Sequence, residues 1–193
     1  MKQGHDQIRD VLAGMSRQAY RGVVVEPVMR EGTEAEPGLV ADIRIQGVWE
    51  RERASFYDLR VVNADAASYS SRPWESVAEE AARAKQRKYD AAAEDLRASF
   101  VPLITSCEGV LHKEFQVFLK RLIESLADKW TKPRSAVASF VRTKLQMATI
   151  RAVSLRLRGS RKTLWSAARE DAQLVREEEA VRLEDGAPLP LAD

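Results

Sequence analysis

The chain has 193 residues, of which 45% are hydrophobic and 31% charged, and its formal net charge is +2. This length allows one sizeable core and leaves little material for a second full domain. No apolar run approaches the ~18 residues that a membrane span needs, and "MKQGHDQIRDVLAG" lacks the apolar centre of a signal peptide. The single cysteine, Cys107, excludes an internal disulfide and a cysteine-based zinc site within this chain. We expect a nuclear or cytoplasmic protein that is not secreted.

The first part of the chain predicts one helix and then three strands. Residues 4–20 carry apolar side chains at helical spacing, which predicts a helix. The short apolar run "GVVVEPV" at 22–28 predicts a strand, and the polar residues 29–39 predict a loop. Residues 40–49 and 56–63 alternate apolar and polar side chains as half-buried strands do. The short charged turn between them favours a hairpin.

The following part predicts a helix, a fourth strand and two more helices. A loop over 63–73 precedes a helix over 74–98, which is rich in Ala, Glu, Lys and Arg. Residues 99–106, "SFVPLITS", predict a strand, and helical patterns then cover 111–130 and 135–159. The predicted fold class is α/β, with an α-β-β-β-α-β core and a helical C-terminal layer.

Charge is distributed unevenly along the chain. Residues 170–193 contain eight acidic and two basic residues, a net charge of −6, so residues 1–169 contain 29 basic and 21 acidic residues, a net charge of +8. We expect residues 1–169 to form one domain and residues 170–193 to form a flexible acidic tail. A basic body suits a nucleic-acid partner, although many soluble proteins with the same imbalance bind none.

Two aspartates stand in neighbouring predicted strands, Asp42 in the second and Asp58 in the third, although aspartate is disfavoured inside strands. Paired antiparallel strands bring such carboxylates close enough to share one hard cation. Mg²⁺ suits a site with few protein carboxylates, because waters and substrate phosphate complete its ligands. Lys85, in the next helix, would orient the attacking water and neutralise charge on the phosphorus. The alternative is that both aspartates only protect strand edges from aggregation.

The order of these segments resembles the restriction-like endonuclease domain of non-long-terminal-repeat retrotransposons and reverse-transcriptase-linked relatives, a member of the PD-(D/E)XK nuclease superfamily. The resemblance runs from about His5 to about Arg161. It rests on "HDQIRD", "VVVEP", "ADIRIQGVWERERASFYDLRVVNADAASY", "KQRKY", "SFVPLITSCEG" and "LRGSR". It implies a restriction-endonuclease-like fold, Mg²⁺ or Mn²⁺ as cofactor and DNA as substrate. A reverse transcriptase and its RNA are implied as partners within a larger polyprotein, and no membrane partner is expected.

The resemblance also implies roles for single residues. Asp42 matches the aspartate of the PD motif and Asp58 the second acid, and both are expected to hold the metal. Lys85 matches the first lysine of the KxxKY motif, the displaced catalytic lysine, and Lys88 and Tyr89 complete that motif.

Two positions depart from the superfamily pattern. Ala41 replaces the proline before Asp42, which is not a ligand, and Arg60 stands where the usual lysine would be. Arginine holds its proton too firmly to act as a base. We therefore expect Lys85 to supply the positive group.

Other polar residues leave alternatives open. His5, on the first helix, is either a surface histidine, which its position favours, or a group near the metal. Glu26 is either a third acid or a strand-end charge. We expect the Tyr89 ring to pack against the sheet, and we assign no functional role to His112.

Several basic residues of the last predicted helix fall off its apolar stripe. They form either a solvated face or, given the resemblance, a surface that contacts DNA phosphates. The residues expected to bind DNA are Arg142, Lys144, Arg151, Arg158 and Arg161.

Two functions follow as expectations. The first is a metal-dependent DNA endonuclease that nicks target DNA for retroelement integration by target-primed reverse transcription. The second is a nuclease-fold module without cleavage, which binds DNA or protein. The presence of Asp42, Asp58 and Lys85 favours the first. An unrelated α/β regulatory protein would be favoured only if the two aspartates pointed away from each other.

Overall fold

The computed structural model describes residues 2–33, 37–64, 66, 69 and 71–160. The chain divides into two units, residues 1–153 and residues 154–193. The architecture below is that of the first unit, and the described part of the second is the end of one helix. The domain boundary expected near residue 169 lies outside the described residues.

Four helices and six strands are formed by the described residues, so the expected α/β class is confirmed. The helices are α1 (Lys2–Ala19), α2 (Trp74–Asp95), α3 (Lys113–Trp130) and α4 (Arg134–Ser160). The strands are β1 (Val24–Val25), β2 (Val28–Arg30), β3 (Leu39–Val40), β4 (Ile43–Gln46), β5 (Ala54–Val62) and β6 (Ser99–Ser106). Within the described part of the chain, no helix combines the length and the apolar character needed to cross a membrane.

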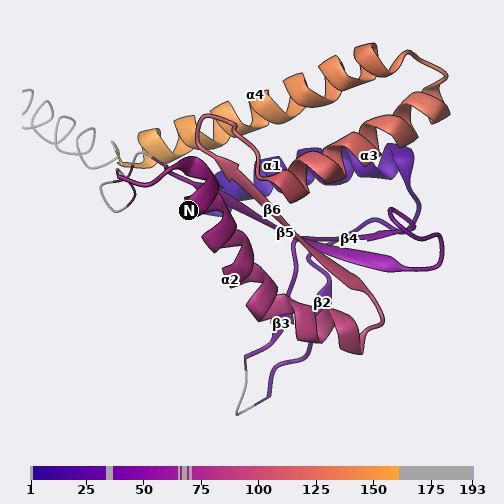
Figure 1. The fold of residues 1–193 in the computed structure, drawn as a ribbon, viewed down its shortest axis with the longest axis horizontal. Helices are drawn as coiled ribbons and strands as arrows, with labels where there is room; N and C mark the ends of the chain where they lie inside the picture. Colours follow the sequence, from indigo (N-terminus) through magenta and orange to yellow (C-terminus); the bar gives the residue numbers. More distant parts are fainter. Residues whose placement is uncertain (1, 34–36, 65, 67–68, 70, 161–193) are drawn as a thin grey trace, which may run out of the picture. The chain divides into compact units, whose positions relative to one another are not determined.

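The main sheet is mixed and has the strand order β1-β4-β5-β6. Strand β4 pairs antiparallel with β1 and with β5, where Ile43 lies opposite Tyr57. The predicted hairpin between the second and third strands is therefore confirmed as β4–β5. Strand β6 runs parallel to β5, and α2 provides the crossover connection between them (Figure 1). A parallel pair needs such a crossover because its strands cannot be joined by a tight turn.

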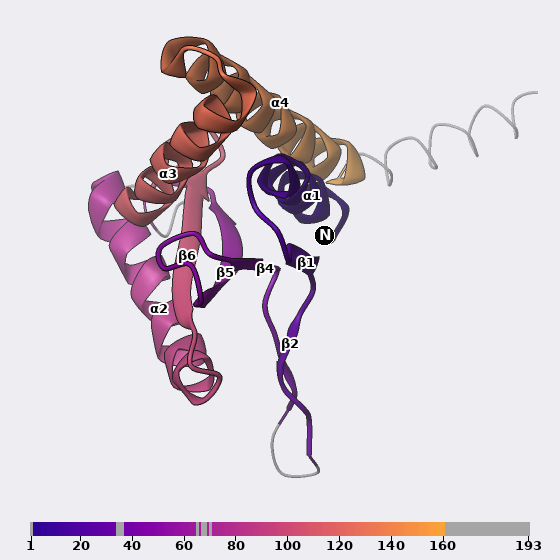
Figure 2. The ribbon, with the colours of Figure 1, turned by 90° about the vertical axis from the view of Figure 1, so that its right-hand side faces the viewer.

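The two faces of β5 carry different side chains because successive residues of a strand alternate in direction. Tyr57 and Leu59 enter the core formed with α1 and α3, whereas Phe56 and Val62 pack toward α2. Figure 2 shows α2 on one side of the sheet and α1 and α3 on the other. Asp58 lies two residues after Phe56 and therefore belongs to the α2 face.

A second, two-stranded sheet is inserted into the first and corrects the two ends of the loop predicted over 29–39, whereas residues 31–33 and 37–38 are irregular, as predicted. Strands β2 and β3 pair antiparallel, and Met29 and Leu39 are buried near Phe56 and Tyr89. The chain thus leaves the main sheet after β1, forms this hairpin and returns at β4, as the downward extension in Figure 2 shows.

The insertion also corrects the predicted position of Asp42, which lies between β3 and β4 and not inside a strand. Glu26 occupies the equivalent crossing point after β1, with a φ of 51°. The Glu26 amide donates a hydrogen bond to the Asp42 carbonyl oxygen at 2.9 Å. Backbone pairing therefore continues while the chain passes from one sheet to the other.

Candidate active site

Asp58 and Lys85 form an ion pair between β5 and α2. Lys85 Nζ contacts Asp58 Oδ2, and the two side chains are 22% and 8% exposed, respectively. A carboxylate removed from water is costly unless a charged or hydrogen-bonding partner compensates it. Because α2 connects β5 to β6 and covers this face of the sheet, its inward side places Lys85 over Asp58.

The Asp42 side chain is hydrogen-bonded to the same strand, β5, at Leu59, the residue that follows Asp58. Its Oδ2 accepts a hydrogen bond of 2.6 Å from the Leu59 backbone N–H. The backbone pairing of β4 with β5 begins at Ile43, opposite Tyr57. The Asp42 backbone N–H also donates to the Tyr57 carbonyl oxygen at 3.0 Å, so Asp42 is held to β5 by its backbone and by its side chain. The structure thus brings both carboxylates to consecutive positions of β5, Asp58 by the chain and Asp42 by its side-chain bond.

His5 approaches Asp42 from α1. Its Nε2 lies 3.2 Å from Asp42 Oδ2 and 3.1 Å from the Leu59 carbonyl oxygen. The hydrogen bond to Asp42 raises the pKa of His5 to about 9, against the opposing effect of burial. His5 is therefore an imidazolium at neutral pH. The His5 side chain is 32% exposed and also contacts Asp42, so its position is compatible with both interpretations.

Arg9 is a buried residue that the sequence interpretation missed. Its Nη1 lies 2.6 Å from Glu26 Oε1 and 3.2 Å from Asp6 Oδ1, and its Nε lies 2.9 Å from Asp10 Oδ1. The Asp6–Arg9 spacing is that of an i,i+3 helix pair and was available as a signal, whereas nothing in the sequence indicates the bond to Glu26. Glu26 thus pairs with Arg9 on α1.

Tyr89 is buried between α2 and the inserted β2–β3 hairpin. Its ring stacks on Phe100 with centroids 4.8 Å apart, and its hydroxyl donates to the Val40 carbonyl oxygen at 3.2 Å. The expectation that this ring packs against the sheet is confirmed. Burial, followed by the neighbouring Asp58 carboxylate, raises the pKa of Tyr89. Lys88 Nζ lies 3.3 Å from the Tyr89 hydroxyl and 4.8 Å above the ring centroid.

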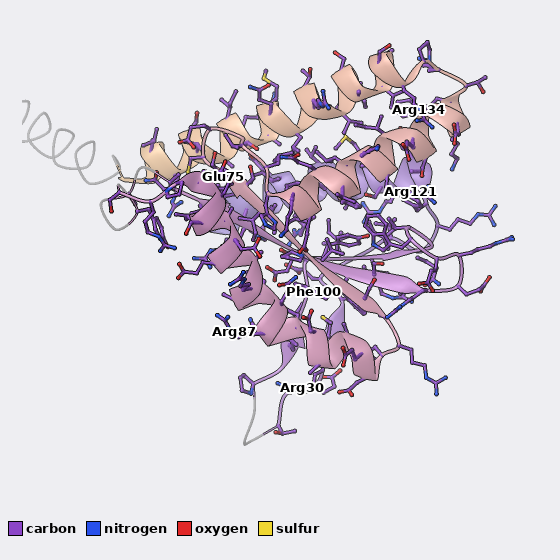
Figure 3. The ribbon with its side chains drawn as sticks, in the orientation of Figure 1. Arg30, Glu75, Arg87, Phe100, Arg121 and Arg134 are labelled. Atoms are coloured by element: carbon purple, nitrogen blue, oxygen red, sulfur yellow. The ribbon has the colours of Figure 1, made fainter. Side chains whose placement is uncertain are left out.

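The remaining basic residues differ in their surroundings. Arg60 is half-buried on the same face of β5 as Asp58, whereas Arg87 is exposed on α2 (Figure 3). Arg134, at the start of α4 (Figure 3), is paired with Glu124 at 3.3 Å.

The residues expected to contact DNA lie on or after α4. Arg142, Lys144 and Arg151 are exposed on this helix. Arg158 belongs to α4, but its side chain and the whole of Arg161 lie outside the described part of the chain.

His112 links α2 to the start of α3, which the sequence did not indicate. The side chain is buried, and its Nε2 lies 3.2 Å from Glu79 Oε2. Lys113 Nζ contacts the same oxygen at 2.9 Å, and Arg83 Nε lies 3.3 Å from Glu79 Oε1. Hydrogen bonds from Lys113 and then His112 lower the pKa of Glu79 to about 2.

The donor set of Asp42 and Asp58 fits Mg²⁺ or Mn²⁺ as a two-carboxylate site. Carboxylate oxygens are the ligands that Mg²⁺ prefers, and it keeps several waters when few protein ligands are present. Among the described residues, no group of three or more His, Cys, Asp or Glu side chains is arranged to hold a metal ion. Any metal site here therefore depends on water and phosphate oxygens for its remaining ligands.

The sequence matches no protein-family model and no curated protein. The nuclease resemblance therefore stays an expectation.

Proposed function

We propose that the protein is a metal-dependent DNA endonuclease that hydrolyses a phosphodiester bond at Asp42, Asp58 and Lys85. One observation carries the proposal. The Lys85–Asp58 ion pair and the bond from Leu59 N–H to Asp42 bring two carboxylates and an ammonium to consecutive positions of one strand. Charged groups that converge in a partly buried position occur at functional sites and also in structural ion-pair networks.

The order of elements supports the proposal. Helix α1, strands β1, β4 and β5, helix α2 and strand β6 follow the α-β-β-β-α-β order that the resemblance implies, with β2–β3 as an insertion. The sheet pairing is antiparallel, antiparallel and then parallel along β1-β4-β5-β6. The insertion begins and ends beside Glu26 and Asp42, so it borders the proposed site.

Each residue has a role that its position allows. Asp42 and Asp58 would hold Mg²⁺ or Mn²⁺, which when bound supplies a Lewis acid and lowers the pKa of a coordinated water. The Lys85 ammonium donates hydrogen bonds and carries positive charge, so it would orient water and stabilise negative charge on the phosphoryl oxygens. Arg60, on the same strand face as Asp58, would clamp a phosphate with its planar guanidinium.

DNA would also be held by Lys144 and Arg151, two exposed basic residues of α4, through phosphate contacts that weaken as salt rises. A nick made at this site leaves a DNA end from which a reverse transcriptase could start. The place of this chain in retroelement integration remains a prediction that rests on the resemblance.

A second candidate is a nuclease-fold module that binds DNA or protein without cleaving. The observation that favours it is the pairing of both carboxylates with protein cations, Asp42 with His5 and Asp58 with Lys85. Such internal compensation stabilises a site that holds no metal ion.

Plasmid nicking separates these candidates. Supercoiled plasmid is incubated with the protein and Mg²⁺ or Mn²⁺, with a chelator as blank, and wild type is compared with Asp58→Asn. Asp95→Asn, at the exposed end of α2, is the matched control, and thermal melting checks that each variant is folded. We expect nicking by wild type and Asp95→Asn only. Equal nicking by Asp58→Asn contradicts the assignment of the site, and DNA binding by wild type without nicking supports the second candidate.

A further inference from the structure

An open groove of about 530 Å³ lies between α1 and α4, apart from the Asp58–Lys85 pair on the α2 face. Its lining residues are Gln7, Asp10 and Val11 from α1 and Thr143, Lys144, Met147, Ala148 and Arg151 from α4. The groove is therefore formed by two helices of the first unit, and both polar and apolar side chains line it.

The charge of this groove comes mainly from α4, whose residues 134–153 contain basic but no acidic side chains. Lys144 and Arg151 both line the groove, and they stand seven residues apart, about 10 Å along a helix. Arg142 is exposed on the same helix but does not line the groove. The acidic member, Asp10, is paired with Arg9 at 2.9 Å, so two cations face the groove against one compensated carboxylate.

Apolar surface accompanies these cations. Met147 is 51% exposed, and Phe140, one turn before Lys144, is 39% exposed. Lys144 Nζ lies 5.3 Å from the centroid of the Phe140 ring. Sites that bind nucleic-acid strands combine cations for phosphates with apolar or aromatic side chains for sugars and bases. A simple solvated helix face would not need the apolar members.

One end of the groove lies toward the N-terminal end of α1. Helices α1 and α4 approach so closely at Gly4 that an added Cβ would lie 2.9 Å from the Ala152 carbonyl oxygen. Gly4 precedes His5, whose imidazole contacts Asp42, and Ala152 follows Arg151. A strand that lies on Lys144 and Arg151 is therefore directed toward the end of α1 that carries His5.

We propose that the α1–α4 groove binds the sugar–phosphate backbone of one DNA strand, with phosphates on Lys144 and Arg151 and sugars against Met147 and Val11. The inference rests on the proposed function for its choice of DNA. It adds where the strand lies. It also predicts that Lys144 and Arg151 contact the strand, whereas Arg142 does not.

The test measures binding separately from cleavage. Fluorescein-labelled single-stranded and duplex oligonucleotides of the same sequence are titrated with protein in chelator, and anisotropy is followed over a range of NaCl concentrations. The variants are Lys144→Glu and Arg151→Glu, and the control is Arg142→Glu, which reverses an exposed charge of the same helix outside the groove.

We expect each groove variant to weaken binding about tenfold or more and to reduce the salt slope by about one, as for loss of a phosphate contact. Arg142→Glu should stay within about threefold of wild type, the residual effect of a charge change outside the contact. Thermal melting confirms folding, and Lys144→Gln and Arg151→Gln replace any variant that is unstable. The single-strand and duplex arms show which form supplies the strand.

Several outcomes would overturn the inference. Equal losses of DNA affinity in all three variants would indicate general attraction to a basic helix. Unchanged binding in both groove variants would show that the groove is not the binding site. If wild type still nicks plasmid in either case, the proposed function stands and only the groove assignment fails. If wild type neither binds nor nicks DNA, both proposals fail together.

Discussion

The two carboxylates of the candidate site are each paired with a helix cation, but from opposite sides of the sheet. Asp58 is nearly buried and faces Lys85 of α2, whereas Asp42 and His5 of α1 are 16% and 32% exposed. Asp42 also accepts the Leu59 amide. Asp58 therefore depends on one lysine for its charge compensation, whereas Asp42 keeps a backbone donor when its cation is removed.

The largest expected effect is that of Lys85→Ala. We expect nicking at saturating DNA to fall by roughly a hundredfold or more, as for removal of one preorganised charge-stabilising group. The free energy of unfolding should fall by about 3 kcal/mol, because Asp58 is left buried without its partner. Plasmid nicking and urea denaturation measure the two effects.

Two further variants separate these effects of Lys85. Arg87→Ala, an exposed basic residue of the same helix, is the control and should leave both measurements close to wild type. Lys85→Ala combined with Asp58→Asn should recover most of the stability but no nicking. Normal nicking by Lys85→Ala, together with an inactive Arg60→Ala, would show that Lys85 is only part of a helix face.

The Asp58–Lys85 and Asp42–His5 pairs also differ in how much of each could be predicted from the sequence. Asp58 is predicted as an acid inside a strand, and Lys85 as a lysine of the next helix that packs across the sheet and matches the KxxKY motif. The sequence left open whether His5 lies at the surface or near the metal, because the answer depends on where α1 lies along the sheet. Helical periodicity predicts the buried face of α1 but not this position.

The same reasoning applies to the fold. The helices and the β4–β5 hairpin follow from periodicity and turn chemistry, and their predicted bounds agree with the structure within a few residues. The strand residues Met29 and Leu39 were predicted as loop, because they flank a polar stretch with Gly and Pro. Their burial depends on Phe56 and Tyr89, which are distant in sequence.

The second prediction concerns the partly exposed pair of Asp42 and His5. Asp42→Ala should lower the free energy of unfolding by about 2 kcal/mol, since the Leu59 N–H loses a charged acceptor. His5→Ala should cost about 1 kcal/mol or less, because Asp42 keeps that amide and is partly solvated. Urea denaturation in chelator measures both, with Gln7→Ala on α1 as the control. A larger loss for His5→Ala than for Asp42→Ala would contradict the comparison.

The third prediction concerns a second ion cluster on α2, centred on Glu79, whose side chain is more exposed than that of Asp58. Glu79 accepts hydrogen bonds from Arg83, His112 and Lys113, and its pKa is lowered from 4.5 to about 2. A folded-state pKa below the unfolded value stabilises the protein above pH 4.5, and the effect is lost as pH falls toward 2. Glu79→Gln should therefore be less stable than wild type at pH 7, by less than Lys85→Ala, and the difference should shrink between pH 4.5 and pH 2.

Urea midpoints at several pH values test this, with Glu75→Gln on the first turn of α2 as the control. A difference between Glu79→Gln and wild type that does not change with pH would mean that the ion cluster contributes nothing and that packing alone is altered.

The smallest expected effects distinguish Arg60 from Lys88, which flank the Asp58–Lys85 pair on β5 and α2. Arg60 is half-buried on the Asp58 face, where its planar guanidinium can meet a phosphate close to the carboxylates. Lys88 is held at the Tyr89 hydroxyl and over its ring, so its charge is already engaged by the protein. We expect Arg60→Ala to weaken DNA binding several-fold and to lower the salt slope by about one, while Lys88→Ala changes both less. Anisotropy titrations in chelator at several salt concentrations measure this, with Arg87→Ala as the control. An effect of Lys88→Ala equal to that of Arg60→Ala would mean that DNA contacts the outer side of α2 as well as β5. DNA binding would then not be concentrated on the Asp58 face of the sheet.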